Sequence, residues 1–352
     1  MTEILNQRQN QLLQGLSYEN KYALSDLFKV LPEKTSAATL RRDLSLLKKK
    51  GYLATEGQRK GTRYWLTMEG LLKTPYDPKI YFNQPIDNRG GRKEYFLRIF
   101  ENFPPHIFLP EEVKKLDDAS HYYRKKMDVS EVIARKELER FVIELSWKSS
   151  RIEGNTYTLL DTERLLREGK EASGHPKEEA FMILNHKQTF NFILENLEDW
   201  KEPKLRDVEN VHRHLIADLN VGTGLRKGIV GVLGTSYQPL SVPYQIREEL
   251  ESLLEAVRKA KDVYTKSLLM LVGISYIQGF EDGNKRTARL CANAILLANN
   301  CAPLSYRSVD EDFYKESMLV FYEKQSLEPM AKIFLEQYLF SCENYLIAEQ
   351  KL

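Results

Sequence analysis

The sequence predicts a mainly α protein with a small N-terminal domain followed by a larger all-helical core. From about residue 92 onward, apolar residues recur at helical spacing almost without interruption. Before that point, three short helical patterns precede two β-rich runs joined by a glycine-containing turn. The chain has 352 residues, which is enough for one large domain and a small one.

The N-terminal patterns begin at residues 5–17 and 22–31, and the third runs from 35 to Gly51. In the third pattern Leu40, Leu44 and Leu47 recur at helical spacing, and the glycine ends the run. The stretches LATE, GQRKG and TRYWLT then predict a strand, a tight turn and a second strand. Residues 1–72 therefore resemble the winged helix-turn-helix domain of bacterial transcription regulators.

This domain carries a local excess of positive charge. Between Lys34 and Arg63 there are nine lysines or arginines and two acidic residues. In a winged helix the third helix enters the major groove and the wing contacts phosphates, so DNA is an expected partner. The residues expected to contact DNA are Thr39, Arg41, Arg42, Arg59, Lys60 and Arg63. The alternative is a winged helix used for protein contact, with the lysines as a solvated face.

Residues 73–92 are rich in proline, glycine and asparagine and show no sustained periodicity, which predicts a linker. The core domain covers residues 93–352 and includes an N-terminal inhibitory helix, described below. Its expected helices lie at 94–102, 128–152, 158–168, 178–198, 205–219, 246–258, 263–278, 286–299, 310–322 and 328–348. The interruption at 228–244 is rich in glycine and β-branched residues and predicts a small β-hairpin.

Residues 263–300 predict a buried helical hairpin, because both arms are apolar around most of their circumference. The second arm begins near Gly283, and Lys285, Arg286 and Arg289 fall within its first two turns. A helix N-terminus has a positive partial charge and free N–H groups, so three cations there predict a site for an anion, most naturally phosphate. The glycine lets the backbone approach the ligand closely.

Two acidic residues, Glu281 and Asp282, precede this helix. A carboxylate at the mouth of a phosphate site can hold Mg²⁺ that bridges phosphate oxygens, and Asp282 is the residue we expect in that role. The alternative is a structural loop in which Asp282 pairs with an arginine and Asn284 caps the helix. Three converging cations favour the anion site.

Residues 278–289 resemble the motif H-x-F-x-[DE]-G-N-[GK]-R-x-x-R of the Fic (Fido) domain family. Every fixed position after the first matches, and the resemblance covers about residues 100–345. The matching residues are Phe280, Asp282, Gly283, Asn284, Lys285, Arg286 and Arg289. The resemblance implies an all-helical domain that transfers AMP from ATP to a serine, threonine or tyrosine hydroxyl of a target protein.

The resemblance also implies roles for these residues, with ATP and Mg²⁺ as cofactors. Mg²⁺ is expected on Asp282, the α-phosphate at Asn284 and the loop N–H groups. The β- and γ-phosphates are expected at Arg286 and Arg289. The implied nucleotide-binding residues are therefore Gly283, Asn284, Lys285, Arg286 and Arg289.

The predicted hairpin at 228–244 resembles the flap of the family, which aligns the target segment by strand addition. The flap residues expected to contact the target are Gly234, Thr235, Ser236 and Tyr237. Arg226 resembles the arginine of a G-x-x-R pattern that precedes the flap, although Thr223 stands where the glycine would be.

The first motif position departs from the family, because Gln278 occupies the place of the general-base histidine. Glutamine has no pKa near neutrality and cannot accept the proton of the target hydroxyl. Losing a positioned base typically removes about 10²–10⁴ in rate. The six histidines all lie outside the motif, at 106, 121, 175, 186, 212 and 214. A substitute base at His212 or His214 is the alternative, and it requires hydrogen-bond reach of the attacking oxygen.

A second signature, SSRIEGN, lies far upstream. Gly154 is expected to end a helix there, which places Glu153 at the helix C-terminus, where a carboxylate needs a cation. Ser149 and Glu153 resemble the inhibitory motif [ST]-x-x-x-E-[GN] of the Fic family, which implies that Glu153 pairs with Arg289 and bars the γ-phosphate. The alternative is an exposed glutamate paired locally with Arg151.

Composition limits the partners and the compartment. The net charge is +2, from 52 basic and 50 acidic residues, so no global field points to nucleic acid or membrane. The three cysteines form no CxxC pair, and no apolar run approaches the roughly 18 residues of a membrane span. A cytoplasmic protein without a membrane partner is expected, and a homodimer is possible because helix-turn-helix proteins often read DNA as dimers.

Two functions follow from these patterns. The first is a Fic-type protein adenylyltransferase that is autoinhibited by Glu153 and catalytically impaired at Gln278. The second is a nucleotide-responsive, DNA-binding transcription regulator, and one protein could combine both. A third alternative is transfer from a different donor on the same fold, because a fold does not fix a reaction.

Overall fold

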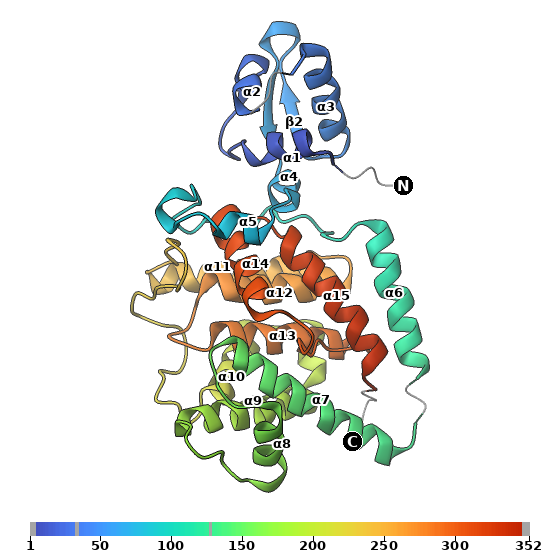
Figure 1. The fold of residues 1–352 in the computed structure, drawn as a ribbon, viewed down its shortest axis with the longest axis vertical. Coiled ribbons are helices and arrows are strands. Elements are labelled where there is room, and N and C mark those ends of the chain that lie inside the picture. The colour runs from blue at the N-terminus through green and yellow to red at the C-terminus, as the bar shows by residue number, and fades with distance from the viewer. Residues whose placement is uncertain (1–4, 32–34, 127–128, 347–352) are drawn as a thin grey trace.

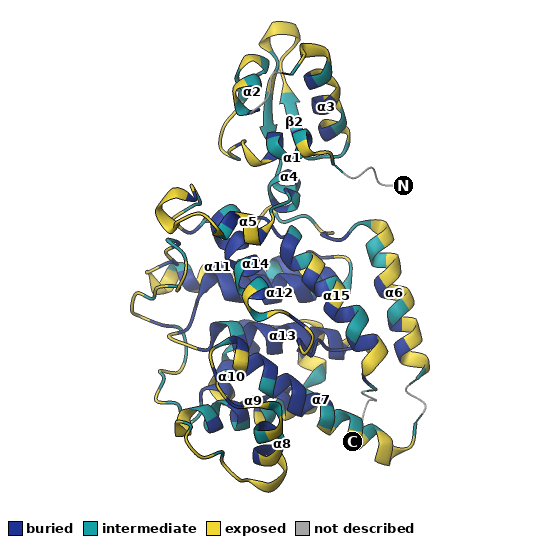
Figure 2. Cartoon of the chain, viewed as in Figure 1, coloured by how far each residue is buried: buried dark blue, intermediate teal, exposed yellow. Residues whose placement is uncertain are grey.

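The computed structural model describes residues 5–31, 35–126 and 129–346. A small N-terminal module lies at one end of a larger helical body (Figure 1). Fifteen α-helices and one three-stranded sheet occur in these described ranges, which confirms the predicted mainly α class. Buried residues concentrate in the middle of the body, in α12 and α13 above all (Figure 2).

The N-terminal module contains three helices and the sheet. Its elements are α1 (Gln7–Gln14), β1 (Tyr22–Ala23), α2 (Leu24–Val30), α3 (Ala37–Lys49), β2 (Leu53–Glu56) and β3 (Arg63–Leu66). The strands are antiparallel in the order β1-β3-β2, with Leu53 opposite Leu66 and Glu56 opposite Arg63. The strand–turn–strand predicted at 53–67 is thus confirmed as a hairpin.

Helix α3 forms where the sequence predicts it, because Ser36 accepts a hydrogen bond from the Thr39 N–H and caps its first turn. The buried leucines Leu40, Leu44 and Leu47 belong to a hydrophobic cluster that is confined to this module. The opposite face of α3 is left to solvent, so the module has a core of its own and one free helical surface.

The segment predicted as a linker is folded onto the body. It contains α5 (Pro78–Phe82), and α4 (Met68–Lys73) immediately precedes it. The Leu327 N–H donates to the Leu72 carbonyl over 2.7 Å, and the Ser326 hydroxyl donates to the Thr74 carbonyl over 2.6 Å. Periodicity could not reveal this docking, because it depends on individual contacts rather than on one continuous apolar face.

The body contains α6 to α15. Their bounds are α6 (Pro110–Lys125), α7 (Glu131–Ile152), α8 (Leu159–Glu168), α9 (Lys177–Glu195), α10 (Leu205–Leu215), α11 (Pro243–Lys259), α12 (Val263–Ile277), α13 (Asn284–Ala298), α14 (Glu311–Lys324) and α15 (Glu328–Asn344). The central hairpin of α12 and α13 is buried on nearly all sides, as predicted from its apolar circumference. The polar loop between these two helices is thereby fixed in the middle of the body.

One helix prediction was wrong, and one helix was not predicted. Residues 94–102 form turns instead of a helix, and Arg98 has φ +63°, which interrupts a helical path. Helix α6 was missed because only a few apolar side chains mark its packed face. Pro110 begins that helix at a position where its missing N–H costs nothing, and Leu116 and Tyr123 are buried.

The predicted β-hairpin at 228–244 is also corrected. This segment contains a turn and one isolated parallel bridge between Gln238 and Glu94, and its last two residues begin α11. Arg226 donates to the carbonyls of Gly228, over 2.6 Å, and of Leu240. Arg226 thus holds the segment at residues 228 and 240, and the chain between them is irregular.

Candidate functional site

The loop between α12 and α13 is held in one conformation by side chains of the loop, of the first residue of α13 and of α10. Phe280 is fully buried and stacks on His212 with ring centroids 3.8 Å apart and planes 10° apart. The Asn284 side chain accepts from the Phe280 N–H over 2.9 Å and donates to the Phe280 carbonyl over 2.8 Å. The loop therefore has one defined path from the end of α12 to the start of α13.

Gly283 is the N-cap of α13 and has φ +77°, a left-handed conformation that favours glycine. No side chain caps the helix at this residue. The N–H groups of the first turn, at Asn284 to Arg286, have no carbonyl one turn earlier within the helix. The start of α13 thus presents free donors and the positive end of a helix dipole.

Three cations follow this helix start, and each is engaged by a carboxylate. Arg289 pairs with Glu153 over 2.9 Å, and Lys285 pairs with the other oxygen of Glu153 over 3.5 Å. Arg286 pairs with Asp282 over 2.9 Å, as the structural-loop alternative predicted. The pairing with Asp282 satisfies one of the two terminal nitrogens of Arg286, and its buried Nη1 has no hydrogen-bond partner among the described residues.

The second signature meets the motif helix directly. Ser149, in α7, accepts two hydrogen bonds of 2.8 Å from Arg289, one at its hydroxyl and one at its carbonyl. Glu153 completes the contact from the C-cap of the same helix. Arg151 instead pairs with Glu311 over 3.0 Å, so the local Glu153–Arg151 pair is not formed.

Burial and charge oppose each other in this cluster. Arg289 is completely buried, which alone would lower the pKa of its guanidinium, but Glu153 together with Tyr314 and Tyr306 outweighs burial, so the net pKa is raised. Burial alone would likewise raise the pKa of Glu153, but the attraction of Arg289 and Lys285 lowers it overall. The Nη1 atom of Arg289 still has no acceptor among the described residues. The helix start therefore retains unused donors for an acidic ligand.

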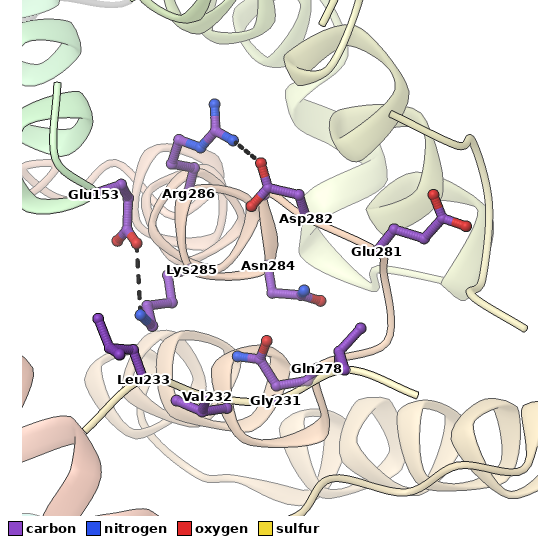
Figure 3. A pocket seen from close by; sticks show the side chains of 12 residues that line it. Glu153, Gly231, Val232, Leu233, Gln278, Glu281, Asp282, Asn284, Lys285 and Arg286 are labelled. Carbon is purple, nitrogen blue, oxygen red and sulfur yellow. Dashed lines mark hydrogen bonds and ion pairs between the residues drawn. The ribbon is translucent and has the colours of Figure 1, made fainter. Parts of the chain in front are cut away.

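Glu153, Lys285 and Arg286 line a cleft of about 170 Å³, whereas Arg289 is not part of its lining (Figure 3). One side is the motif loop, with Asp282, Asn284 and Lys285; Glu153 forms another, and residues 230–233 a third. Gln278 also lines the cleft. Its amide donates to the Ser275 carbonyl over 2.6 Å, and its backbone adopts φ +52° at the C-cap of α12. An uncharged amide thus occupies the position next to the cation-rich helix start.

The match to a family of known proteins covers this cleft. Residues 202–296 match the model of the Fic/DOC family. The chain contains a Fic/DOC domain. The matched range includes α10, α12 and most of α13, together with the loop that holds the three cations.

Similar proteins support the same fold. A probable protein adenylyltransferase of Aquifex aeolicus (strain VF5) is 29% identical over 100 residues, which are 28% of this chain and 31% of that protein. The chain thus matches less than a third of the length of that relative. Fic-1 (aa134–508) of C. elegans matches with a TM-score of 0.56 at 20% identity, covering 67% of this chain and 70% of that one.

A Fic domain-containing signaling protein of Bacteroides thetaiotaomicron VPI-5482 matches with a TM-score of 0.57 at 17% identity, over 65% of this chain and 94% of that one. A Fic family protein of Desulfovibrio desulfuricans G20 matches with a TM-score of 0.56 at 23% identity, over 68% and 75%. At these identities the likeness concerns the fold, and the all-helical fold of the Fic/DOC domain agrees with it.

The histidines of the chain lie outside the cleft lining. His212 has its Nε2 atom 3.0 Å from the Asp282 carbonyl, and burial lowers its pKa to about 4. As a neutral ring it donates to that carbonyl, which leaves this nitrogen unable to act as a base. His186 is fully buried, and burial lowers its pKa to about 3. His214 stacks on Phe192 at 4.3 Å. None of these three rings lines the cleft.

His212 nevertheless has a role at the site that the sequence did not indicate. It fixes the loop twice, by stacking on Phe280 and by its hydrogen bond to Asp282. The sequence shows only a histidine on an amphipathic helix, a pattern common in ordinary cores. The spatial neighbourhood of α10 and the motif loop is what identifies the contact.

The residues expected to contact a target at 234–237 are anchored in the Fic/DOC domain. Thr235 donates to Glu323 over 2.6 Å, and Tyr237 is buried, with its hydroxyl donating to the Tyr276 carbonyl over 2.8 Å. Gly234 gives its carbonyl to Arg89, and Ser236 is half-buried. The exposed part of the segment comes before them, at residues 229–233, where it lines the cleft.

The residues expected to contact DNA lie in the N-terminal module, on a different part of the molecule from the cleft (Figure 1). The exposed ones are Arg41, Arg42, Arg59, Lys60 and Arg63. Thr39 is half-buried, and its hydroxyl hydrogen-bonds with that of Ser36. Within the described ranges no carboxylate pairs with any of the five cations, and Lys34 lies outside those ranges.

Metal and membrane features are limited. The described part of the chain has no cluster of three histidine, cysteine or acidic side chains fit to hold a metal. Asp282 and Glu281 are both exposed and both line the cleft; Glu281 accepts from the Gly222 N–H over 3.1 Å, and Asp282 pairs with Arg286. In the described ranges no helix is both long and apolar enough to span a bilayer.

Proposed function

We propose that the Fic/DOC domain has the architecture of a protein adenylyltransferase, held off by Glu153 and catalytically impaired at Gln278. The observation that carries this proposal is the start of α13. Lys285 and Arg286 line the cleft there, Arg286 and Arg289 keep donors without an acceptor among the described residues, and the Glu153 carboxylate takes the place of an anion. The partial match to a probable protein adenylyltransferase supports the same reaction class.

The residues at the cleft suit a triphosphate with a bound metal ion. Buried Nη1 atoms of Arg286 and Arg289 lack acceptors among the described residues, and the first-turn N–H groups of α13 add neutral donors. Asp282 would hold Mg²⁺, which usually takes one or two carboxylates together with phosphate oxygens. A single exposed carboxylate is therefore enough, although Arg286 has to yield its contact with Asp282.

The proposed substrate is a protein with a serine, threonine or tyrosine hydroxyl, and the donor is ATP. The hydroxyl oxygen forms a bond to the α-phosphorus, the bond from that phosphorus to the pyrophosphate oxygen breaks, and the hydroxyl proton must pass to a base. Gln278 can accept a hydrogen bond from the hydroxyl but cannot take the proton. Turnover is therefore expected to be about 10²–10⁴ below that of a chain with a base at this position.

Glu153 is proposed to act as a brake because it occupies two of the three cations. A phosphate group at Arg289 would meet a carboxylate already within 2.9 Å. Binding must therefore displace Glu153 or tolerate the repulsion of like charges, and either one weakens the nucleotide complex. Removing the carboxylate frees Arg289 and Lys285 for the ligand.

Calorimetry with Mg-ATP tests the brake. The Glu153→Gly variant is expected to bind more tightly than the parent chain, whereas Glu281→Gln, at the cleft mouth but without a cation partner, is expected to bind as the parent does. Absence of binding heat in Glu153→Gly would remove the nucleotide site and with it the proposed reaction class.

Labelled ATP tests the chemistry. With Glu153→Gly as background, Gln278→His is expected to raise transfer of label to protein by about 10²–10⁴, and Gln278→Leu is expected to leave it unchanged. Equal labelling by both variants would show that position 278 does not hold the base. If ATP binds but no protein is labelled even with histidine present, another donor chemistry becomes the better hypothesis.

The second candidate function is a nucleotide-responsive DNA-binding regulator, with residues 1–72 as a winged helix that could act as a homodimer. The observation in its favour is the set of exposed, unpaired cations on α3 and on the β2–β3 turn. A gel shift with the upstream DNA of its own gene at low salt tests it, because phosphate contacts are strongest there. Absence of a shift would leave protein contact as the role of this module.

A further inference from the structure

A buried carboxylate outside the cleft joins three separate parts of the chain. Glu323, in α14, is 2% exposed. One of its oxygens accepts from the Thr235 hydroxyl over 2.6 Å, and the other accepts from the Tyr81 hydroxyl over 2.7 Å. Arg89, also buried, lies 3.5 Å from the first oxygen. Glu323 therefore joins the segment predicted as a linker, through Tyr81 and Arg89, to the segment that follows the cleft lining, through Thr235.

Backbone contacts strengthen the same junction. The Arg92 N–H donates to the Glu323 carbonyl over 2.7 Å, and the Gln238 N–H donates to the Lys93 carbonyl over 2.7 Å. Arg89 donates to the Gly234 carbonyl over 2.9 Å. At Gly91 an added Cβ would lie 2.6 Å from the Glu323 Cβ, so this position needs a glycine.

The contacts around Glu323 lie next to one side of the cleft, at residues 230–233. Residues 230–233, which we call the cleft wall, end at Gly234, whose carbonyl Arg89 holds. Leu233 is 97% exposed and Ile229, just before the wall, is 85% exposed, whereas Val232 is partly buried and packs against the core. At its other end Arg226 binds the Gly228 carbonyl over 2.6 Å. The path of the wall therefore depends on these two end contacts and on the packing of Val232.

The junction also reaches the N-terminal module. Arg92 pairs with Glu19 over 2.6 Å, and Gln14 donates to the Pro75 carbonyl over 2.5 Å. Tyr18 packs against Phe96 with ring centroids 5.6 Å apart. A chain of direct contacts thus runs from the module, through residues 75–93, to the cleft wall.

We propose that residues 81–93 are a positioning element: through Arg89 and Glu323 they set the orientation of the cleft wall, and they couple that wall to the N-terminal module. The proposal deepens the proposed function, because this wall is where a protein target would be presented to the nucleotide. Its physical basis is that a segment without its own ladder takes the geometry of its anchors. In this proposal Glu323, Arg89 and Thr235 act on the wall through their contacts with one another and with Gly234, as positioning residues.

A nitroxide on Leu233→Cys reports the wall without requiring ATP or a target. The native cysteines are all buried, so the label is directed to the new exposed thiol. In this background Thr235→Val removes the donor to Glu323, whereas Thr235→Ser keeps it. The valine variant is expected to gain a mobile spectral component, and the serine variant is expected to retain the parent spectrum.

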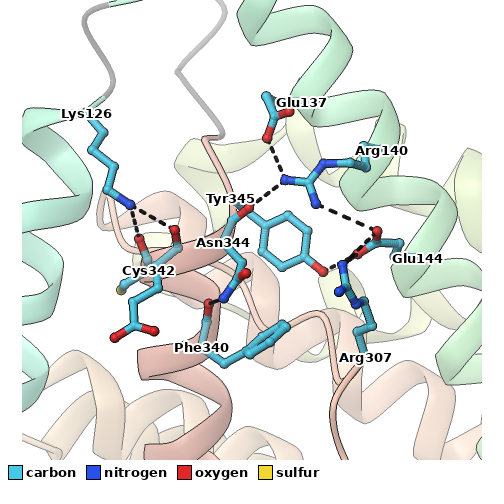
Figure 4. A network of polar contacts seen from close by, with 10 residues as sticks. Lys126, Glu137, Arg140, Glu144, Arg307, Phe340, Cys342, Asn344 and Tyr345 are labelled. Carbon is cyan, nitrogen blue, oxygen red and sulfur yellow. Dashed lines mark hydrogen bonds and ion pairs between the residues drawn. The ribbon is translucent and has the colours of Figure 1, made fainter.

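A matched control separates positioning from general loss of stability. Tyr345 donates to buried Glu144, which also pairs with Arg307 over 3.1 Å and with Arg140 over 3.7 Å (Figure 4). None of these residues lines the cleft. Tyr345→Phe therefore removes the same kind of tyrosine–glutamate hydrogen bond as Tyr81→Phe. Only Tyr81→Phe is expected to mobilise the label.

The coupling to the module has its own readout. Arg92→Ala breaks the contact with Glu19 and is expected to mobilise the label less than Thr235→Val does, with the melting temperature of the body unchanged. Identical spectra for the parent, Thr235→Val and Tyr81→Phe would overturn the positioning role. An unchanged spectrum in Arg92→Ala alone would remove the coupling. Mg-ATP calorimetry on Glu153→Gly is a separate measurement, so failure of the nucleotide site is distinguishable from failure of this proposal.

Discussion

The two groups of cations in this protein have opposite surroundings. At the start of α13, Arg286 and Arg289 are buried and already face carboxylates within 2.9 Å. On the N-terminal module, Arg41, Arg42 and Lys60 are exposed, and no carboxylate of the described chain pairs with them. Sequence alone makes both groups look like clusters of positive charge next to helical segments.

Burial explains the difference. A guanidinium removed from water needs a partner at all times, so the chain supplies Glu153 and Asp282 when no ligand is present. A guanidinium on the surface is solvated by water, so leaving it without a carboxylate partner costs little folding free energy, and it stays available to an external polyanion. We therefore expect an internal carboxylate to compete with any anion that binds the first group, and ionic strength to weaken the binding of any polyanion by the second.

The sharpest contrast comes from removing one arginine of each kind. Arg289→Met leaves Glu153 without its nearest cation and Ser149 without two donors, and breaking a buried pair typically costs about 3–5 kcal/mol. Arg41→Met lies at an exposed site and is expected to change the free energy of unfolding by less than about 0.5 kcal/mol. Thermal and denaturant unfolding of the two variants measures both values. Equal losses would mean that burial does not separate the two groups.

A pH titration tests the neutral histidine that supports the buried group. Burial lowers the pKa of His212 from 6.5 to about 4, so the unfolded chain binds a proton at higher pH than the folded one. Stability is then lost as pH falls from 6.5 toward 4, by an amount on the order of 2–3 kcal/mol. His212→Phe retains the stacking on Phe280 and removes this loss.

We therefore expect the difference in melting temperature between His212→Phe and the parent to change with pH. His212→Phe is expected to melt below the parent at pH 7.5, because it lacks the hydrogen bond to Asp282, and to approach or exceed it at pH 4.5. The exposed His121→Phe serves as the control and is expected to follow the parent. A constant difference between His212→Phe and the parent across this range would contradict the buried neutral state.

The central site was predictable because its signals are local. A glycine, an acid and three cations within eight residues predict the loop, the start of the helix and its need for an anion. The resemblance to the inhibitory motif implied the pairing of Glu153 with Arg289, which the structure contains. The mainly α fold class and most helices of the body were also predictable, because each of these helices packs one continuous face, and its apolar residues therefore recur at helical spacing. The roles of these residues in nucleotide transfer remain predictions.

The misses concern contacts between distant segments. Tyr81 and Arg89 look like linker residues, yet both meet Glu323 more than two hundred positions away. The predicted hairpin at 228–244 failed because Arg226 takes carbonyls of this segment, and no local pattern encodes that. His212 was assigned no structural role, because its contact with the motif loop exists only once α10 and α13 are packed together.

The smallest expected effect concerns the exposed cations. If they bind phosphates of DNA, each contact releases counterions, and the plot of log affinity against log salt has a slope of about −0.9 per contact. Arg41→Ala is expected to make that slope shallower by about one and to weaken binding about equally for all sequences. Lys285→Ala, at the cleft, is expected to leave the slope unchanged, since Glu153 already pairs with that lysine in the domain. A loss confined to one DNA sequence, with an unchanged slope, would instead indicate that Arg41 reads a base, so this titration decides whether the surface group recognises charge alone.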